Sequence, residues 1–265
     1  MNEFATRMLT ITIGAIFGIF MVSYNLLTKI FFFGSILCLS YFEFAQGMRS
    51  EKLSAIDSTM LFVLCLVNTF GMSLFLIYGY EIMNSAIAMY ICHLVIIWIA
   101  SKTVDKVLSY AFIAFIWFAP SMFICIIYAN NDPMLIIWII TVVWFTDGGA
   151  YMFGKLFGKT KLMQSISPNK TVEGTVLGIT LSILVSIAIS RFYDRISGND
   201  WAVIAIIGGI IGQIGDLCES ALKRWLKIKD SGTIMVGHGG ILDRFDSIYM
   251  AVPVIHVFLY YRGYI

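Results

Sequence analysis

The sequence predicts an all-α polytopic membrane protein with about nine transmembrane helices in one bundle. Of its 265 residues, 59% are hydrophobic and only 13% are charged, and the mean hydropathy is +0.87. Nine spans of roughly 20 residues would use about 180 residues to cross a hydrocarbon core about 30 Å thick. Too few polar residues remain to coat a soluble enzyme or a sizeable extramembrane domain.

The apolar runs follow one another along the whole chain and are separated mostly by short connections. Short connections favour antiparallel neighbours, so we expect a single integral-membrane domain over 1–265. Its first half, 1–130, is mainly apolar and is expected to face lipid or another subunit. Its second half, 131–265, carries two polar loops, 154–174 and 223–246. The predicted spans are 7–24, 30–46, 59–78, 82–101, 107–129, 133–153, 175–190, 201–217 and 247–261.

The distribution of basic residues predicts the orientation of these spans. If the N-terminus is cytoplasmic, the cytoplasmic side of the membrane holds all 18 Lys and Arg residues except Lys29, Arg191, Arg195 and Arg262. Basic loop residues are retained in the cytoplasm, so both polar loops are expected there, in a multi-pass protein of the cell (inner) membrane. The net charge of +2 provides no broad basic surface, which excludes nucleic acid as a partner.

Polar residues at membrane depth recur with helical spacing in the second half. One group consists of Asp216, Glu219, Ser220 and Lys223, at i, i+3, i+4 and i+7 on one helix face. Asp243 and Asp246 are likewise three residues apart. Carboxylates at this depth are costly and usually face a cavity or a cation, and an oxygen-rich site of this kind suits Mg²⁺. The open alternative is a set of interfacial salt bridges with the neighbouring basic residues.

The two polar loops could supply the groups that bind phosphate. Lysines alternate with glycines in 154–174, so backbone amides and ammonium groups could hold phosphate oxygens. The alternative is an ordinary positive-inside loop attracted to anionic lipid. In the second loop, the glycines of 237–240 would let a phosphate or nucleotide approach closely. His238 between them is either a hydrogen-bonding loop residue or a group with direct chemistry.

Residues 220–232 and 237–246 together resemble the C-terminal motif of the phosphatidate cytidylyltransferases, also called CDP-diacylglycerol synthases. The stretches 147–155, 158–162 and 166–174 are similar to the second polar block of the same family. The chain departs from the family pattern at three positions. The family usually has proline where this chain has Val236, and Leu, Ile or Phe where it has Met235. Lys is common in the family where this chain has Asn169. Every charged position of the C-terminal motif is present.

The resemblance implies transfer of CMP from CTP to phosphatidic acid, which yields CDP-diacylglycerol and pyrophosphate. It implies Mg²⁺ as cofactor, with a second cation left open, and CTP, phosphatidic acid and the lipid bilayer as partners; a homodimer is a further expectation. The expected catalytic residues are Lys223, Arg224, His238, Asp243 and Asp246. The expected metal ligands are Asp216, Glu219, Asp243 and Asp246. The expected substrate-binding residues are Asp147, Ser167, Lys170, Thr171, Ser220, Lys229, Asp230, Gly239, Gly240 and Arg244.

Two other functions stay open at this point. A CTP-dependent enzyme acting on another lipid, such as an ether-lipid cytidylyltransferase or a polyprenol kinase, would share the charged helix face. A small ion-coupled transporter could use the buried carboxylates as a cation site. The transporter hypothesis does not explain why so many basic residues accompany the carboxylates on one side.

Overall fold

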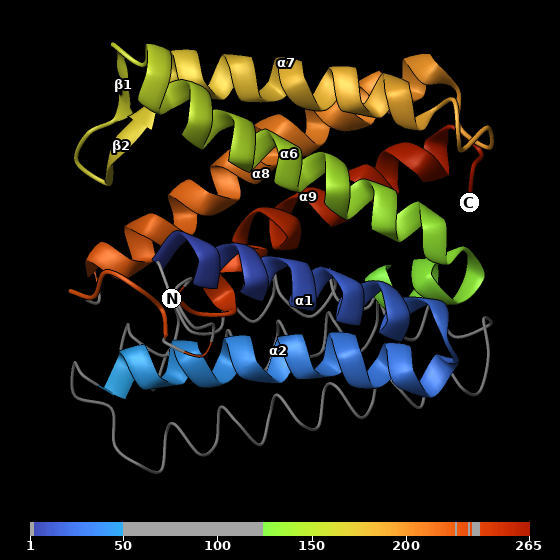
Figure 1. The fold of residues 1–265 in the computed structure, drawn as a ribbon, viewed down its shortest axis with the longest axis horizontal. Coiled ribbons are helices and arrows are strands. Elements are labelled where there is room, and N and C mark those ends of the chain that lie inside the picture. The colour runs from blue at the N-terminus through green and yellow to red at the C-terminus, as the bar shows by residue number, and fades with distance from the viewer. Residues whose placement is uncertain (1–2, 50–123, 226, 233, 235–238) are drawn as a thin grey trace, which may run out of the picture.

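The structure, a computed structural model, describes residues 3–49, 124–225, 227–232, 234 and 239–265, and most of these residues are helical (Figure 1). The predicted spans 59–78 and 82–101, most of 107–129 and His238 lie outside the described residues. The elements are α1 (Glu3–Ser23), α2 (Leu26–Arg49), α6 (Pro133–Phe157), β1 (Lys161–Met163), β2 (Ser167–Thr171), α7 (Val172–Ile189), α8 (Gly198–Trp225) and α9 (Leu242–Tyr261).

Four of the described helices are long and apolar enough to cross a membrane. These segments are Leu26–Phe44, Pro133–Phe157, Val172–Ile189 and Gly198–Ala221. Helices α1, α6 and α7 also expose large apolar side chains, among them Phe20, Phe145 and Leu184. Such exposure is unfavourable in water but favourable against lipid tails. The prediction of a helical multi-pass membrane protein is therefore confirmed in this coarse form.

The polar connections of the second half gather at one end of the bundle. Figure 1 shows the β1–β2 hairpin, the end of α8 and the start of α9 at the same end, which is also where the N-terminus lies. The C-terminus lies at the opposite end. Strand β2 contacts α6, α7 and α8, so the hairpin packs onto the helices. The chemistry-bearing residues of both loops are thus brought to one end of the molecule.

The first polar loop is more ordered than the sequence suggested, and the fold is not purely α-helical. Residues 154–174 were expected to be a polar loop, but α6 continues to Phe157 and an antiparallel hairpin follows, pairing Lys161 with Thr171 and Met163 with Ser167. Glu173, in the first turn of α7, accepts hydrogen bonds from the backbone N–H groups of Lys159 and Thr160 at 3.0–3.1 Å. These contacts fix the start of the hairpin to the start of α7.

The second polar loop is shorter than predicted, because helices extend into it from both sides. Helix α8 continues to Trp225 and α9 begins at Leu242. Lys223, Asp243 and Asp246 therefore lie on helices. Hydropathy marks only the apolar part of a helix, whereas backbone hydrogen bonding continues through its polar end turns, so a span read from hydropathy ends too early.

Close packing of α6 on α7 depends on glycines. A Cβ at Gly178 would lie 2.5 Å from the carbonyl oxygen of Thr146, and a Cβ at Gly174 would lie 2.6 Å from the carbonyl oxygen of Ala150. A Cβ at Gly149 would lie 3.0 Å from the Cα of Gly178. Small residues let transmembrane helices approach to backbone contact, where van der Waals packing holds them together. This contact fixes the hairpin end of α7 relative to α6.

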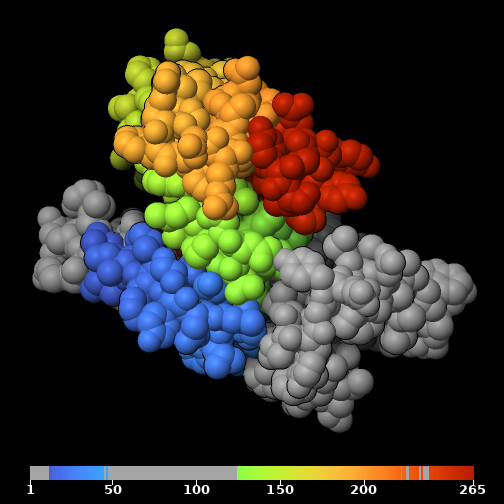
Figure 2. Space-filling model, turned by 90° about the vertical axis from the view of Figure 1, so that its right-hand side faces the viewer, coloured from blue at the N-terminus to red at the C-terminus, as the bar shows by residue number. Residues whose placement is uncertain are grey.

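Charged side chains fasten the opposite end of the bundle. Asp132 accepts hydrogen bonds from the hydroxyl of Tyr193 at 2.6 Å and from Nη1 of Arg195 at 2.7 Å. Asp200, at the start of α8, accepts two hydrogen bonds from Arg262 at the end of α9, both at 3.0 Å. Figure 2 looks onto this end and shows the orange α7–α8 region beside the red end of α9 and above the green start of α6. These contacts join the start of α6 to the α7–α8 connection, and the start of α8 to the end of α9.

We predict that Gly178→Ala destabilises the α6–α7 pair by about 1–3 kcal/mol, because the added methyl group has no room against the backbone of α6. Gly148→Ala is the matched control, since nothing lies within 4 Å of a Cβ built there. The control should be neutral or stabilising by up to about 1 kcal/mol, because alanine favours a helix over glycine. Unfolding of the purified protein in mixed micelles measures both, and equal stability of the two variants would contradict the packing argument.

Candidate active site

Three carboxylates converge where α8 and α9 cross at the loop end of the bundle. Asp216 and Glu219 project from α8 and Asp246 from α9, and each places an oxygen within 4.8 Å of the other two. Gly215 permits this approach, because a Cβ there would lie 2.7 Å from the carbonyl oxygen of Asp246. The helical spacing predicted from the sequence thus places Asp216 and Glu219 on the face that meets α9.

Lys170 brings the hairpin into this site. Its ammonium group lies 2.6 Å from Oδ2 of Asp216 and 3.1 Å from Oε1 of Gln213. The amide of Gln213 in turn donates to Oδ1 of Asp147 on α6 at 2.8 Å. Ser220 donates to Oδ1 of Asp216 at 3.3 Å. A lysine and an amide therefore connect carboxylates from α6 and α8 in one network.

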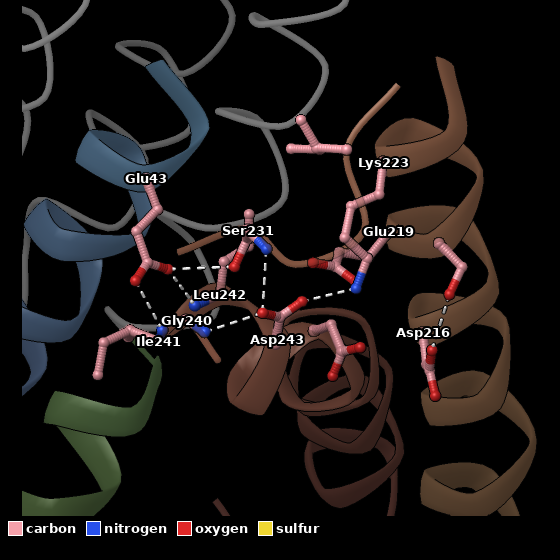
Figure 3. Close-up of polar contacts among 12 residues, drawn as sticks. Glu43, Asp216, Glu219, Lys223, Ser231, Gly240, Ile241, Leu242 and Asp243 are labelled. Atoms are coloured by element: carbon pink, nitrogen blue, oxygen red, sulfur yellow. Dashed lines mark hydrogen bonds and ion pairs between the residues drawn. The ribbon is translucent and has the colours of Figure 1, made fainter. Parts of the chain in front are cut away.

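Lys223 forms the other cationic part of the site (Figure 3). Its ammonium group forms ion pairs with Glu219, one turn earlier on α8, and with Oδ1 of Asp243 at 2.6 Å. Burial acts to lower the pKa of Lys223, but the two carboxylates outweigh it and the pKa lies above its usual value. The ammonium group therefore stays charged at neutral pH, held between α8 and α9.

Asp243 is hydrogen-bonded on both of its oxygens. Besides Lys223, it accepts from the backbone N–H of Ser231 at 3.1 Å and of Gly240 at 2.9 Å, both on Oδ2. Burial acts to raise the pKa of Asp243, but Lys223 and the N–H of Gly240 lower it below its usual value. Gly239 adopts a φ of +83°, and a Cβ there would lie 2.8 Å from Oδ2 of Asp243. The Asp243 carboxylate thus packs closely against a backbone turn at Gly239, where glycine adopts the positive φ and leaves room for the carboxylate.

The carboxylate cluster has the composition of a divalent-cation site. Both side-chain oxygens of Glu219 are buried, and its carboxylate is paired with the Lys223 ammonium group. Asp216, Glu219 and Asp246 offer oxygen ligands, which Mg²⁺ prefers. These residues therefore fit the expected metal. Asp243, also expected as a ligand, lies outside this group of three and binds Lys223, and its role as a metal ligand stays a prediction.

Several predicted site residues have other partners in the structure. Thr171 caps the start of α7, where its hydroxyl accepts from the N–H of Gly174 at 3.2 Å. The guanidinium of Arg224 donates to the carbonyl of Ile228 at 3.1 Å. Among the other predicted residues, Ser167 is half-buried, and Lys229, Asp230 and Arg244 are exposed.

Two polar residues of this region escaped the sequence analysis. Gln213 lies in the apolar part of α8, and Glu43 lies in α2, 1% exposed, with its carboxylate against the segment that leads into α9. A charged residue within an apolar span is itself a signal of function, and Glu43 carries that signal. Its partners are 188 to 199 positions away in the chain, so spacing alone could not identify them.

Comparison of the sequence with known proteins relates the chain to an enzyme family. The model of the family described as "Cytidylyltransferase family" matches residues 5–262. A phosphatidate cytidylyltransferase of Staphylococcus aureus (strain COL) is 44% identical over 126 residues, which are 47% of this chain and 48% of that protein. The Staphylococcus saprophyticus protein of the same name is 50% identical over 119 residues, 44% of this chain and 46% of that protein.

The chain spans about half the length of the curated relatives it matches, whereas the family model covers nearly all of it. The family resemblance of the two polar blocks is thereby confirmed: the chain belongs to the cytidylyltransferase family.

Proposed function

We propose that this protein transfers CMP from CTP to phosphatidic acid and releases pyrophosphate. The observation that carries the proposal is the convergence of Asp216, Glu219 and Asp246 beside two half-buried lysines at one end of a bundle of apolar helices. The names of the relatives support the same substrate pair. A site of this kind can bind polyphosphate from water while the lipid tails stay in hydrocarbon.

The reaction requires positioning and charge neutralisation more than proton transfer. A phosphate oxygen of phosphatidic acid attacks the α-phosphorus of CTP, and a new P–O bond forms. The bond from the α-phosphorus to the oxygen that bridges the α- and β-phosphorus breaks, and pyrophosphate leaves with the electron pair. The attacking phosphate monoester is already anionic near neutral pH, so no strong general base is needed.

Asp216, Glu219 and Asp246 are the residues that would hold Mg²⁺. When bound, Mg²⁺ neutralises charge on the CTP phosphates and on the departing pyrophosphate. The network contains five carboxylates and two ammonium groups, namely Asp147, Asp216, Glu219, Asp243, Asp246, Lys170 and Lys223. These five carboxyl groups form an oxygen-rich set of ligands that suits a divalent cation, and a second cation stays open.

Lys223 and Lys170 are the residues that we assign to phosphate oxygens. Both ammonium groups lie next to the carboxylate cluster, and Asp243 holds Lys223 with its charge in place. We therefore assign Asp243 to positioning Lys223. Arg224, Lys229 and Arg244 carry further positive charge at this end of the bundle, and the His238 assignment stays a prediction.

The lipid and membrane arrangement belong to the same proposal. The headgroup reaches the site at the cytoplasmic face, and the tails enter sideways between helices within that leaflet. We place the N-terminus in the cytoplasm, as predicted from the basic residues, and the protein in the cell (inner) membrane with nine spans in all. A homodimer stays the expected assembly.

One assay separates this function from the alternatives. Purified protein in detergent is incubated with labelled CTP, Mg²⁺ and either phosphatidic acid, an ether-lipid phosphate or a polyprenol. Labelled CDP-diacylglycerol from phosphatidic acid is the expected product. If product forms only from the ether-lipid phosphate or only from the polyprenol, that lipid is the substrate in place of phosphatidic acid. Ion flux in proteoliposomes without consumption of CTP indicates a transporter.

We predict that Asp246→Asn and Asp216→Asn each reduce formation of CDP-diacylglycerol by about 100-fold or more, about 2.7 kcal/mol, because each removes a charged oxygen ligand. Chelation with EDTA should abolish activity, and added Mg²⁺ should restore it in the wild type. Asp194→Asn makes the same chemical change at an exposed position between α7 and α8 and should leave the rate unchanged. Near-normal Mg²⁺-dependent activity in a folded Asp246→Asn protein would show that the metal assignment is wrong.

We further predict that Lys223→Ala lowers turnover by tenfold or more, about 1.4 kcal/mol, because it removes a half-buried ammonium group from the phosphate site. Arg195→Ala is the control, since Arg195 is exposed and binds Asp132 at the opposite end of the bundle. Steady-state rates at saturating CTP measure both variants. A loss of less than threefold in Lys223→Ala would remove this lysine from the catalytic residues.

A further inference from the structure

Glu43 connects the apolar first half of the chain to the active site. It lies near the end of α2 and is 1% exposed. Its Oε1 accepts the backbone N–H of Ile241 at 3.0 Å, and its Oε2 accepts the backbone N–H of Leu242 at 2.9 Å and the hydroxyl of Ser231 at 3.2 Å (Figure 3). A buried carboxylate with three donors is stable only while all of them stay in place.

Two glycines form the slot that the Glu43 carboxylate occupies. A Cβ built at Gly232 would lie 2.6 Å from Cδ of Glu43, and one built at Gly240 would lie 2.8 Å from it. Any larger residue at either position would collide with the carboxyl group. Gly240, which the sequence suggested as a point of phosphate approach, here makes room for Glu43, and its own N–H binds Asp243.

The same short segment also binds Asp243, so the two carboxylates hold it from both sides. Ser231 gives its hydroxyl to Glu43 and its backbone N–H to Asp243. Gly240 donates its N–H to Asp243, and the next two N–H groups along the chain, of Ile241 and Leu242, go to Glu43. Both backbone donors of Asp243 are therefore fixed by contacts with Glu43.

We propose that Glu43 is a positioning residue of the active site, which acts through Asp243 to hold the Lys223 ammonium group in place. The inference rests on the proposed function, because Lys223 matters to the reaction only if phosphates bind beside it. Without Glu43, the segment before α9 loses three acceptor contacts and Asp243 loses the fixed geometry of its two backbone donors. Lys223 then has a partner whose position varies.

Glu43→Gln tests the proposal, because it keeps the size of the side chain and replaces one acceptor oxygen with an NH₂ donor that faces another donor. We expect kcat to fall about tenfold or more while KM for CTP changes by less than about threefold. Glu43→Asp keeps the charge and both acceptors and should recover part of the lost kcat. Ser40→Ala, one turn earlier on α2, removes a hydrogen bond to Tyr249 away from this segment and should retain wild-type kcat.

A double-mutant cycle with Lys223→Ala distinguishes positioning from a general effect on folding. If Glu43 acts through Lys223, Glu43→Gln should reduce kcat by less than about twofold in the Lys223→Ala background. An equal reduction in both backgrounds would overturn the proposal, as would a wild-type kcat for Glu43→Gln or a loss confined to KM.

Hydrogen exchange separates this inference from the proposed function. In Glu43→Gln, the amides of Ile241 and Leu242 should exchange at least about tenfold faster than in the wild type, because they lose their acceptors. If the wild type makes no CDP-diacylglycerol, the proposed function fails and exchange still reports on the contact. Unchanged exchange in Glu43→Gln would overturn the role of Glu43 whatever the activity.

Discussion

Buried and half-buried carboxylates in a bundle of apolar helices set the main constraint on this structure. Each must meet a cation or a hydrogen-bond donor, because a lone charge in a low-dielectric environment is strongly unfavourable. Lys170 meets Asp216, Lys223 meets both Glu219 and Asp243, and backbone N–H groups complete the shell of Asp243. The hairpin, the end of α8 and the start of α9 are all held by these contacts, so the same charges that prepare the site also fix the elements around it.

Sequence patterns identified the parts of this site that depend on one helix. The spacing of Asp216, Glu219 and Lys223 placed them on one face of α8, and Asp246 followed from its position in the next charged block. The pairing of Lys223 with Asp243 could not be read from spacing, because it depends on how α8 and α9 cross. Composition indicated a membrane protein because it measures how apolar the chain is. It indicated no contacts, because it carries no information on geometry.

The hairpin and Glu43 were missed for different physical reasons. Strands β1 and β2 are only three and five residues long and lie among polar residues, so they have no hydrophobic alternation to detect. Glu43 lies in a stretch that periodicity describes as a lipid-facing or packing helix, and its partners are far along the chain. Gly240 was visible in the sequence as a point of close approach, but the room that Gly232 and Gly240 leave for a distant side chain is seen only in the folded chain.

Helices α8 and α9 are joined by charged contacts near both ends, through Asp200 and Arg262 at one end and through Lys223 and Asp243 at the other. Two antiparallel helices fastened in this way cannot separate at either end without breaking a charged pair. For the function proposed above, the seam between α8 and α9 is therefore an unfavourable path for a lipid that enters the site sideways from the bilayer. The lipid tails would instead enter between other helices of the bundle, and α8 and α9 would form the fixed wall against which the headgroup binds.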